Sequence, residues 1–193
     1  MISALILAAG ESSRMGTDKA LLAYRGRTFL EHILTTLREA GLERVTVVLG
    51  HHAEEIRSAV DLTGAEVVIN PDYRLGQTSS LQAGLKALDQ PGLDAVVLCL
   101  VDHPAVSADV VKKLVAAYRE SAAQVVVPTF QGQRGHPVVI GRQLFPELLA
   151  LDSSQGANAV IRKYPDERVF VEVLDAGILL NIDDPEAYQQ LIR

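Results

Sequence analysis

Length, composition and charge bound the possibilities for this 193-residue chain before any motif is considered. Hydrophobic residues make up 48% of it and charged residues 22%, which is typical of a folded globular protein and excludes a disordered segment. No apolar run approaches the roughly 20 residues that a membrane-spanning helix needs, so we expect no membrane partner. The formal net charge is −6 and no basic stripe is present, which argues against nucleic acid as a partner.

The same numbers favour one domain over residues 1–193, because the length lies within the usual range of a single core. The chain begins directly with a strand-like run and lacks a basic stretch before it, so we expect no signal peptide and a cytoplasmic location. Cys99 is the only cysteine and lies in an apolar run. We expect it to be a buried packing residue in a reducing compartment.

Short apolar runs rich in Val, Ile and Leu alternate with helical periods along the first two thirds of the chain. The runs that we interpret as strands are Ile2 to Leu7, Val45 to Leu49, Glu66 to Ile69, Ala95 to Leu100 and Gln124 to Val127. They are almost continuously apolar, as strands covered on both faces are, and the alternation with helices is typical of a mostly parallel sheet. The predicted fold class is therefore α/β.

The helices between these strands show one apolar stripe each. "TFLEHILTTLREAG" places its large apolar residues at helical spacing, with Thr28 as a candidate N-cap and Gly41 as a stop. "HAEEIRSAV", "TSSLQAGLKAL" and "SADVVKKLVAAYRES" repeat this pattern. We expect all four helices to cover the sheet.

The alternation of strands and helices is interrupted after Thr129. "FQGQRGHPVVIG" is typical of a turn or hairpin, and a helical stretch then leads to the polar break "DSSQG", so we interpret residues from about 130 to 165 as an elaboration of the domain. The alternation returns with the apolar runs "RVFVEVL" and "GILLNI" and with the helix "DPEAYQQLI", which begins at an Asp-Pro pair.

The stretch "LILAAGESSRMGTDK" joins the first strand to a loop with small residues and two cations. Ala8, Ala9 and Gly10 would let backbone N–H groups approach an anion closely, and Arg14 and Lys19 would neutralise phosphate oxygens. The spacing matches neither a P-loop nor the G-x-G-x-x-G fingerprint. Since ligands of such sheets bind at the carboxyl ends of strands, we interpret this loop as a triphosphate site rather than an ordinary surface loop.

Two acidic positions follow other apolar runs. Asp102 comes directly after Ala95 to Leu100 and one further valine, and Asp183 follows "LLNI". Mg²⁺ prefers hard oxygen ligands, one or two carboxylates together with substrate phosphates, so we predict that these two residues bind Mg²⁺. Asp184 precedes Pro185 at a helix start, and we interpret it as a helix cap.

In this order the motifs resemble the MobA-like nucleotidyltransferase family, and most closely its molybdenum cofactor cytidylyltransferase (MocA-like) branch. "LILAAGESSRMGTDKALL" is similar to the family signature LAAGxSxRMGxxK, and "GQTSSLQAGL", "VDHP", "RGHPVVIG" and "NIDDPEAY" follow in the order of the family. The resemblance implies a Rossmann-like three-layer sandwich of the nucleotide-diphospho-sugar transferase type. It also implies nucleotide-binding residues, which are Leu7, Ala8, Ala9, Gly10, Arg14, Lys19, Gly76, Thr78, Ser79 and Ser80.

The resemblance further implies an activity, in which a nucleoside monophosphate moves from an NTP to a phosphorylated acceptor and pyrophosphate leaves. Arg14, Lys19, Asp102 and Asp183 would be the catalytic residues, Mg²⁺ the cofactor, and Gly135 with His136 would meet the acceptor. The sequence "LAAG" favours CTP over GTP, because guanylyl-transferring relatives tend to have a second glycine there. Molybdenum cofactor would be the acceptor, with a molybdoenzyme as a partner.

Two departures from the family pattern and three alternatives stand beside this hypothesis. "DSSQGANAVI" lacks an acidic residue and an arginine that the branch often carries, and His103 replaces a common Gln. For His51 and His52 we favour surface or capping roles over ligation. The alternatives are a nucleotidyltransferase for a sugar phosphate or other small acceptor, a non-catalytic protein that delivers nucleotide or cofactor, and a structural module.

Overall fold

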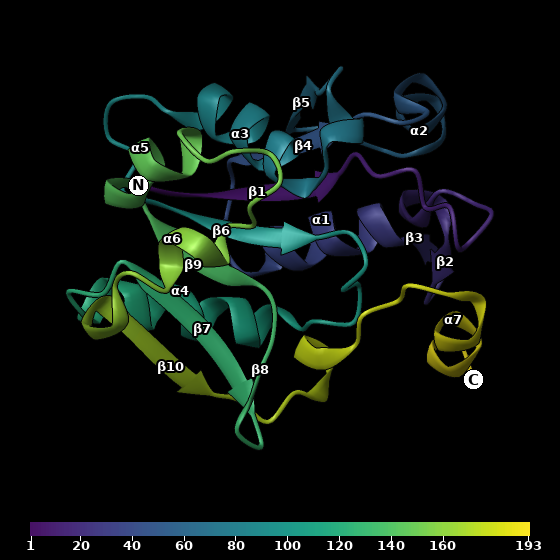
Figure 1. Ribbon diagram of the computed structural model, residues 1–193. Coiled ribbons are helices and arrows are strands. Elements are labelled where there is room, and N and C mark those ends of the chain that lie inside the picture. The colour runs from purple at the N-terminus through teal and green to yellow at the C-terminus, as the bar shows by residue number, and fades with distance from the viewer.

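The computed structural model describes residues 1–193 and confirms the α/β class with a central eight-stranded sheet (Figure 1). The strand order is β10-β7-β9-β6-β1-β4-β5, and β8 pairs with β7. The strands of this sheet are β1 (Ile2–Ala8), β4 (Val45–Leu49), β5 (Ala65–Ile69), β6 (Ala95–Leu100), β7 (Val125–Phe130), β8 (Gln133–Arg134), β9 (Val138–Gly141) and β10 (Arg168–Glu172).

The predicted helices are present with small shifts at their ends: α1 (Phe29–Glu39), α2 (Ala53–Ala59), α3 (Gln77–Leu88), α4 (Ala108–Glu120), α5 (Phe145–Leu149) and α7 (Pro185–Leu191). The structure adds a short helix that was not predicted, α6 (Asn158–Ile161). A two-stranded ribbon, β2 (Ala23–Tyr24) and β3 (Arg27–Thr28), precedes α1. None of the helices has both the length and the apolar character required to cross a bilayer.

The sheet is mostly parallel, as the apolar strands predict. β1 pairs in parallel with β4 and β6, β4 with β5, and β10 with β7. The exceptions come from the segment 130–165: β8 pairs antiparallel with β7, and β9 lies inside the sheet and pairs antiparallel with β6 and with β7. The "RGHPVVIG" turn therefore supplies an interior strand, and it also brings Gly135 and His136 close to the end of β6.

Alternate residues of β1 divide the core into two layers. Ala4 and Ile6 pack with α1, α2 and α4 in one cluster, whereas Leu5 and Leu7 pack with α3, α5 and α6 in the other. This is the period-2 alternation of a strand covered on both faces. Cys99 is buried in the first cluster, and burial raises the pKa of its thiol to about 12, which confirms its packing role.

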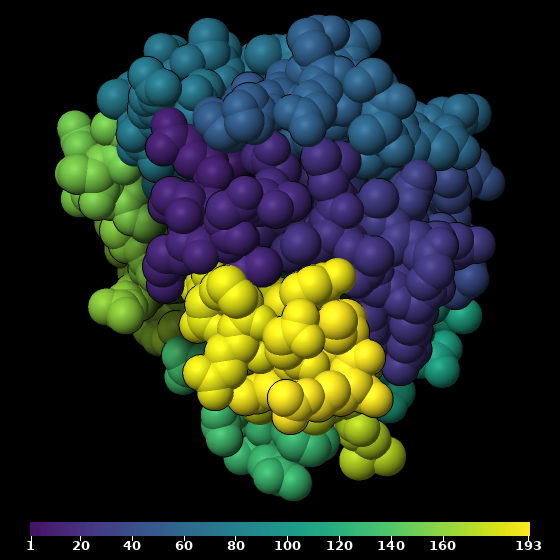
Figure 2. Space-filling model, turned by 90° about the vertical axis from the view of Figure 1, so that its right-hand side faces the viewer, coloured from purple at the N-terminus to yellow at the C-terminus, as the bar shows by residue number.

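The run "GILLNI" differs from the prediction, because it forms a 3₁₀ turn (Ala176–Leu179) followed by irregular chain and not a strand. Ile178 is buried in the main core and Ile182 in a small cluster with Leu22, Tyr24 and Phe29, so these side chains anchor the segment without a strand ladder. The C-terminal residues consequently pack on the N-terminal part of the chain, as Figure 2 shows by the contact of the yellow and purple surfaces.

The N-terminus of α1 provides a test of local folding. Thr28 Oγ1 accepts a hydrogen bond from Glu31 N at 3.2 Å, and Glu31 Oε2 accepts one from Thr28 N at 2.8 Å, which is a complete capping box. We expect Thr28→Ala to lower the free energy of unfolding by about 1 kcal/mol in urea titrations, because it leaves Glu31 N without its side-chain partner. Thr28→Ser keeps the acceptor and should restore most of the loss; equal losses in both variants would contradict the capping role.

Candidate active site

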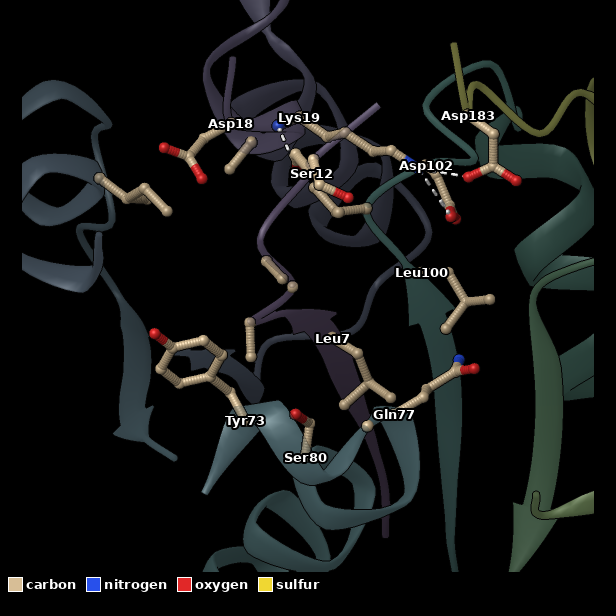
Figure 3. A pocket seen from close by; sticks show the side chains of 18 of the residues that line it. Leu7, Ser12, Asp18, Lys19, Tyr73, Gln77, Ser80, Leu100, Asp102 and Asp183 are labelled. Atoms are coloured by element: carbon tan, nitrogen blue, oxygen red, sulfur yellow. Dashed lines mark hydrogen bonds and ion pairs between the residues drawn. The ribbon is translucent and has the colours of Figure 1, made fainter. Parts of the chain in front are cut away.

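A cavity of about 320 Å³ opens at the carboxyl ends of β1 and β6, where the topology of the sheet predicts a ligand (Figure 3). The loop after β1 forms one wall, the start of α3 forms the floor, and the segments after β6 and before α7 close the far side. The lining includes most of the residues predicted to bind nucleotide or metal: Leu7, Ala8, Ala9, Gly10, Arg14, Lys19, Gly76, Ser80, Asp102 and Asp183.

The loop from Ala8 to Lys19 is held in shape by its own hydrogen bonds and by a neighbouring turn. Lys19 N donates to Ser12 Oγ at 3.0 Å, and His51 N donates to the carbonyl oxygen of Ala9 at 3.1 Å. Ser12 has a φ of 50°, in the left-handed region that most L residues avoid. Gly10 has no neighbouring atom where a Cβ would lie, so this part of the loop is open toward the cavity.

Lys19 lies between the two predicted metal ligands. Its Nζ is 2.5 Å from Asp183 Oδ1 and 3.4 Å from Asp102 Oδ2, and its side chain is only 12% exposed (Figure 3). Arg14 Nη2 lies 3.9 Å from Asp183 Oδ2, with a side chain 73% exposed. The four predicted catalytic residues thus come together at one end of the cavity, and an ammonium group occupies the position between the carboxylates.

Both carboxylates are kept ionised by this arrangement. Burial by itself raises the pKa of Asp102, but the hydrogen bond from His103, the charges of His103 and Lys19, and the Lys19 hydrogen bond together hold it below its usual value. The pKa of Asp183 is lowered chiefly by the hydrogen bond from Lys19. Two ionised carboxylates facing one cation are a suitable donor set for a hard divalent ion.

Asp183 reaches this position through a loop and not at the end of a strand. Ile182 N donates to the carbonyl oxygen of Asp102 at 2.9 Å, which brings the two acidic residues together, and Asn181 Nδ2 donates to Asp183 Oδ2 at 2.8 Å. The neighbouring Asp184 caps α7, because its Oδ1 accepts from Ala187 N at 2.9 Å. The two adjacent aspartates therefore have different structural roles, and the prediction of a cap at Asp184 is confirmed.

The predicted nucleoside-binding residues at the start of α3 do not all line the same cavity. Gly76 and Ser80 line the cavity described above, whereas Thr78 lines the neighbouring one. Ser79 lines neither: its Oγ lies within donating distance of two backbone carbonyls, 2.8 Å from Gly76 O and 2.9 Å from Asp72 O. The hydroxyl of Ser79 thus caps the turn before α3, and its contact with nucleoside stays a prediction.

A second cavity, of about 400 Å³, shares Leu7, Gln77 and Leu100 with the first. Its charged lining residues are three arginines, and no acidic residue lines it although the chain is acidic overall. The Nε atom of Arg168 is buried without a hydrogen-bond partner. The rest of the wall is largely apolar and includes Phe170; the arginines are Arg134, Arg162 and Arg168.

His103 and His136 connect the two cavities to the acidic pair. His103 Nδ1 lies 2.9 Å from Asp102 Oδ1, and the rings of the two histidines have centroids 4.9 Å apart. His136 lines the second cavity, and its Nδ1 is buried without a partner. The adjacent Gly135 packs so closely on the carbonyl of Ile178 that a Cβ there would clash. Close packing explains this glycine without contact to a ligand.

Sequence reasoning missed several residues at the two cavities. Ser12, Ser13, Asp18, Tyr73 and Gln77 line the first, and the three arginines line the second. Asp18 stands next to Lys19 in the loop signature, so its position was a usable signal. The arginines are dispersed over β8, α6 and β10, and only the strand order brings them together.

The burial of His136 predicts a dependence of stability on pH. Desolvation lowers the pKa of His136 to about 4, so between pH 4 and 6.5 the unfolded chain binds a proton that the folded chain does not. We expect the wild type to lose about 2 kcal/mol of unfolding free energy from this group between pH 7 and pH 5, and His136→Gln to lose less, in urea titrations at both pH values.

His52→Asn is the control, because its effect on the pH dependence of stability should have the opposite sign. The pKa of His52 is raised by its hydrogen bond to Asp18, so the proton that this histidine binds stabilises the fold at pH 5. Removal of the histidine should therefore increase the loss of unfolding free energy between pH 7 and pH 5. An identical pH dependence in wild type and His136→Gln would show that His136 is not buried in its neutral form.

Comparison with known proteins places the chain in a sequence family. It is 31% identical to a nicotine blue oxidoreductase of Paenarthrobacter nicotinovorans, an alignment that covers 100% of this chain and 95% of that protein. It is also 26% identical to the molybdenum cofactor cytidylyltransferase of Escherichia coli, over 97% of this chain and 93% of that protein.

A solved structure supports the same assignment. The complex of Rv0371c from Mycobacterium tuberculosis with manganese superposes with a TM-score of 0.79 at 28% sequence identity, covering 99% of this chain and 97% of that one. The family model described as the MobA-like NTP transferase domain matches residues 4–169, which include the loop from Ala8 to Lys19, Asp102 and every lining residue of the second cavity except Phe170. The chain therefore belongs to the family of MobA-like NTP transferase domains.

Proposed function

We propose that this protein is a Mg²⁺-dependent nucleotidyltransferase that moves a nucleoside monophosphate from an NTP to a phosphorylated acceptor and releases pyrophosphate. The observation that carries the proposal is the meeting of Asp102 and Asp183 around the Lys19 ammonium, beside the loop after β1. Family membership supports the reaction class. A non-catalytic carrier or a structural module would not need two ionised carboxylates at the same point.

The residues of the chain supply positioning and charge neutralisation. Backbone amides near Gly10 would orient the departing pyrophosphate, while Arg14 and Lys19 would offset the charge that develops on it. Mg²⁺ held by Asp102 and Asp183 would supply a positive charge between the acceptor and the α-phosphate. Lys19 lies where such an ion would bind, so we expect its ammonium to turn toward the phosphates when the ion is present.

The second cavity is the proposed acceptor site. It adjoins the nucleotide cavity through shared wall residues, and its three arginines with no acidic neighbour favour an anionic acceptor. Its apolar wall and the ring of Phe170 favour an acceptor with a planar body. Molybdenum cofactor, a phosphorylated heterocycle, is the acceptor that we propose, and a molybdoenzyme would receive the product. The relative from Escherichia coli supports this choice by its name.

Two other functions compete with this one. A sugar phosphate or other small phosphorylated acceptor would use the same first cavity and differ only in the second. The relative named as an oxidoreductase adds a redox reaction to the comparison. We favour nucleotidyl transfer over a redox reaction because the charged groups in the first cavity, two carboxylates facing a lysine and an arginine, suit a metal-bound triphosphate.

The reaction class is tested by incubating the protein with each of the four NTPs, Mg²⁺ and candidate acceptors, and identifying the products by mass. We expect pyrophosphate and a cytidylylated molybdenum cofactor. The methyl group of Ala9 leaves less room beside the base than glycine would, so kcat/KM should favour CTP over GTP by about tenfold or more. Comparable values for both nucleotides would remove the ground for CTP, and NAD(P)H-dependent reduction without pyrophosphate would contradict the proposed class.

The shared metal site predicts non-additive effects of two substitutions. Asp102→Asn and Asp183→Asn should each slow turnover and raise the Mg²⁺ concentration for half-maximal rate, because an amide is a weaker ligand for a hard cation. The double variant should lose less than the sum of both effects in free energy, since the two groups act on one ion. Asp184→Asn is the matched control and should change turnover little. Additive losses, or a larger defect in Asp184→Asn, would show that Asp183 is not the second ligand.

A further inference from the structure

A group of metal-ligating atoms lies on the side of the first cavity opposite Asp102 and Asp183 (Figure 3 shows its Asp18). Asp18 Oδ2 is 2.8 Å from His52 Nδ1, and Asp18 Oδ1 is 3.4 Å from His51 Nδ1. One ligand atom from each of the three residues lies within 4.8 Å of the others. Both imidazoles therefore turn the same nitrogen toward one carboxylate.

The charge of Asp18 is not balanced by a lysine or an arginine. Its side chain is 8% exposed, and its ion-pair partners are the two histidines alone. The cations of the same loop go elsewhere, since both Lys19 and Arg14 pair with Asp183. A buried carboxylate is stabilised by a positive partner, and around Asp18 the two imidazoles occupy the position where such a partner would bind.

We propose that Asp18, His51 and His52 bind a divalent transition-metal ion of the Zn²⁺ class. Two imidazole nitrogens and one carboxylate oxygen suit Zn²⁺ and disfavour Mg²⁺, which prefers oxygen ligands. One ligand atom of each residue lies within 4.8 Å of the others, so small side-chain movements would bring all three to the distance of about 2.0 to 2.2 Å that Zn²⁺ requires. Glu55, whose Oε2 is 3.8 Å from His52 Nδ1, is the nearest candidate for a fourth ligand.

The ion would join two segments that are far apart in the sequence. Asp18 lies near the end of the loop that runs from Ala8 to Lys19, and His51 with His52 form the turn between β4 and α2. A single backbone hydrogen bond, from His51 N to Ala9 O, already connects this turn to the loop. The metal would add a second connection at the other end of the loop, next to Lys19. It is thus a structural ion that orders the loop, and it is separate from the Mg²⁺ of the proposed reaction.

Zn²⁺ binding, measured on protein that carries no histidine tag, tests this site directly. After removal of metals with a chelator, the wild type should bind one Zn²⁺ per chain by isothermal titration calorimetry, and Co²⁺ should give visible d–d absorption of tetrahedral type. Excess Mg²⁺ should not displace the Zn²⁺. The ion should also raise the melting temperature, because it binds only the folded arrangement.

Substitutions of the proposed ligands test where the ion binds. His51→Gln and His52→Asn should each weaken Zn²⁺ binding by at least about tenfold, since each removes a ligand; asparagine suits the left-handed backbone at residue 52. His32→Gln, a half-buried histidine on α1, is the matched control and should bind as the wild type does. Unchanged Zn²⁺ affinity in both ligand variants would overturn the proposal, as would loss of Zn²⁺ only in Asp102→Asn. The readout is metal binding, so it stands or fails independently of nucleotidyl transfer.

Discussion

The site depends on keeping two carboxylates of like charge close together in a partly buried place. Asp102 and Asp183 both approach Lys19 Nζ, and without a cation between them their mutual repulsion would separate them or protonate one. The ammonium resolves this conflict in the free protein. In the proposed reaction the same position would hold Mg²⁺, so the group that stabilises the acidic pair would also have to give way to the ion.

The fold meets this requirement by joining three distant parts of the chain. β1 and β6 are adjacent in the sheet, which places the loop carrying Lys19 next to the segment carrying Asp102. The third part is the C-terminal chain, held by the burial of Ile178 and Ile182 and by one backbone hydrogen bond to Asp102. Stability of the parallel sheet and assembly of the acidic pair are thus coupled.

The sequence predicted most of the fold because its signals are local and periodic. Apolar runs marked β1, β4 and β6, and the Thr28 cap marked the start of α1. "GILLNI" misled the prediction, because anchoring side chains in an irregular segment are as apolar as a strand. Ser79 was assigned to the nucleotide by motif, yet hydroxyls in turns also satisfy backbone carbonyls. The arginines of the second cavity carried no local signal, since sheet topology alone brings them together.

The charges around the two cavities also constrain how substrates could be oriented. Asp102 and Asp183 lie at one end of the first cavity, whereas the charged side chains of the second cavity are all arginines. An acceptor whose phosphate enters the first cavity would meet the carboxylates, and repulsion there is relieved only by a bound cation. A second anionic group on its body would be drawn to Arg162 and Arg168. For the proposed reaction, this charge pattern favours an acceptor that is anionic at both ends and that would bind beside the carboxylates once Mg²⁺ neutralises them.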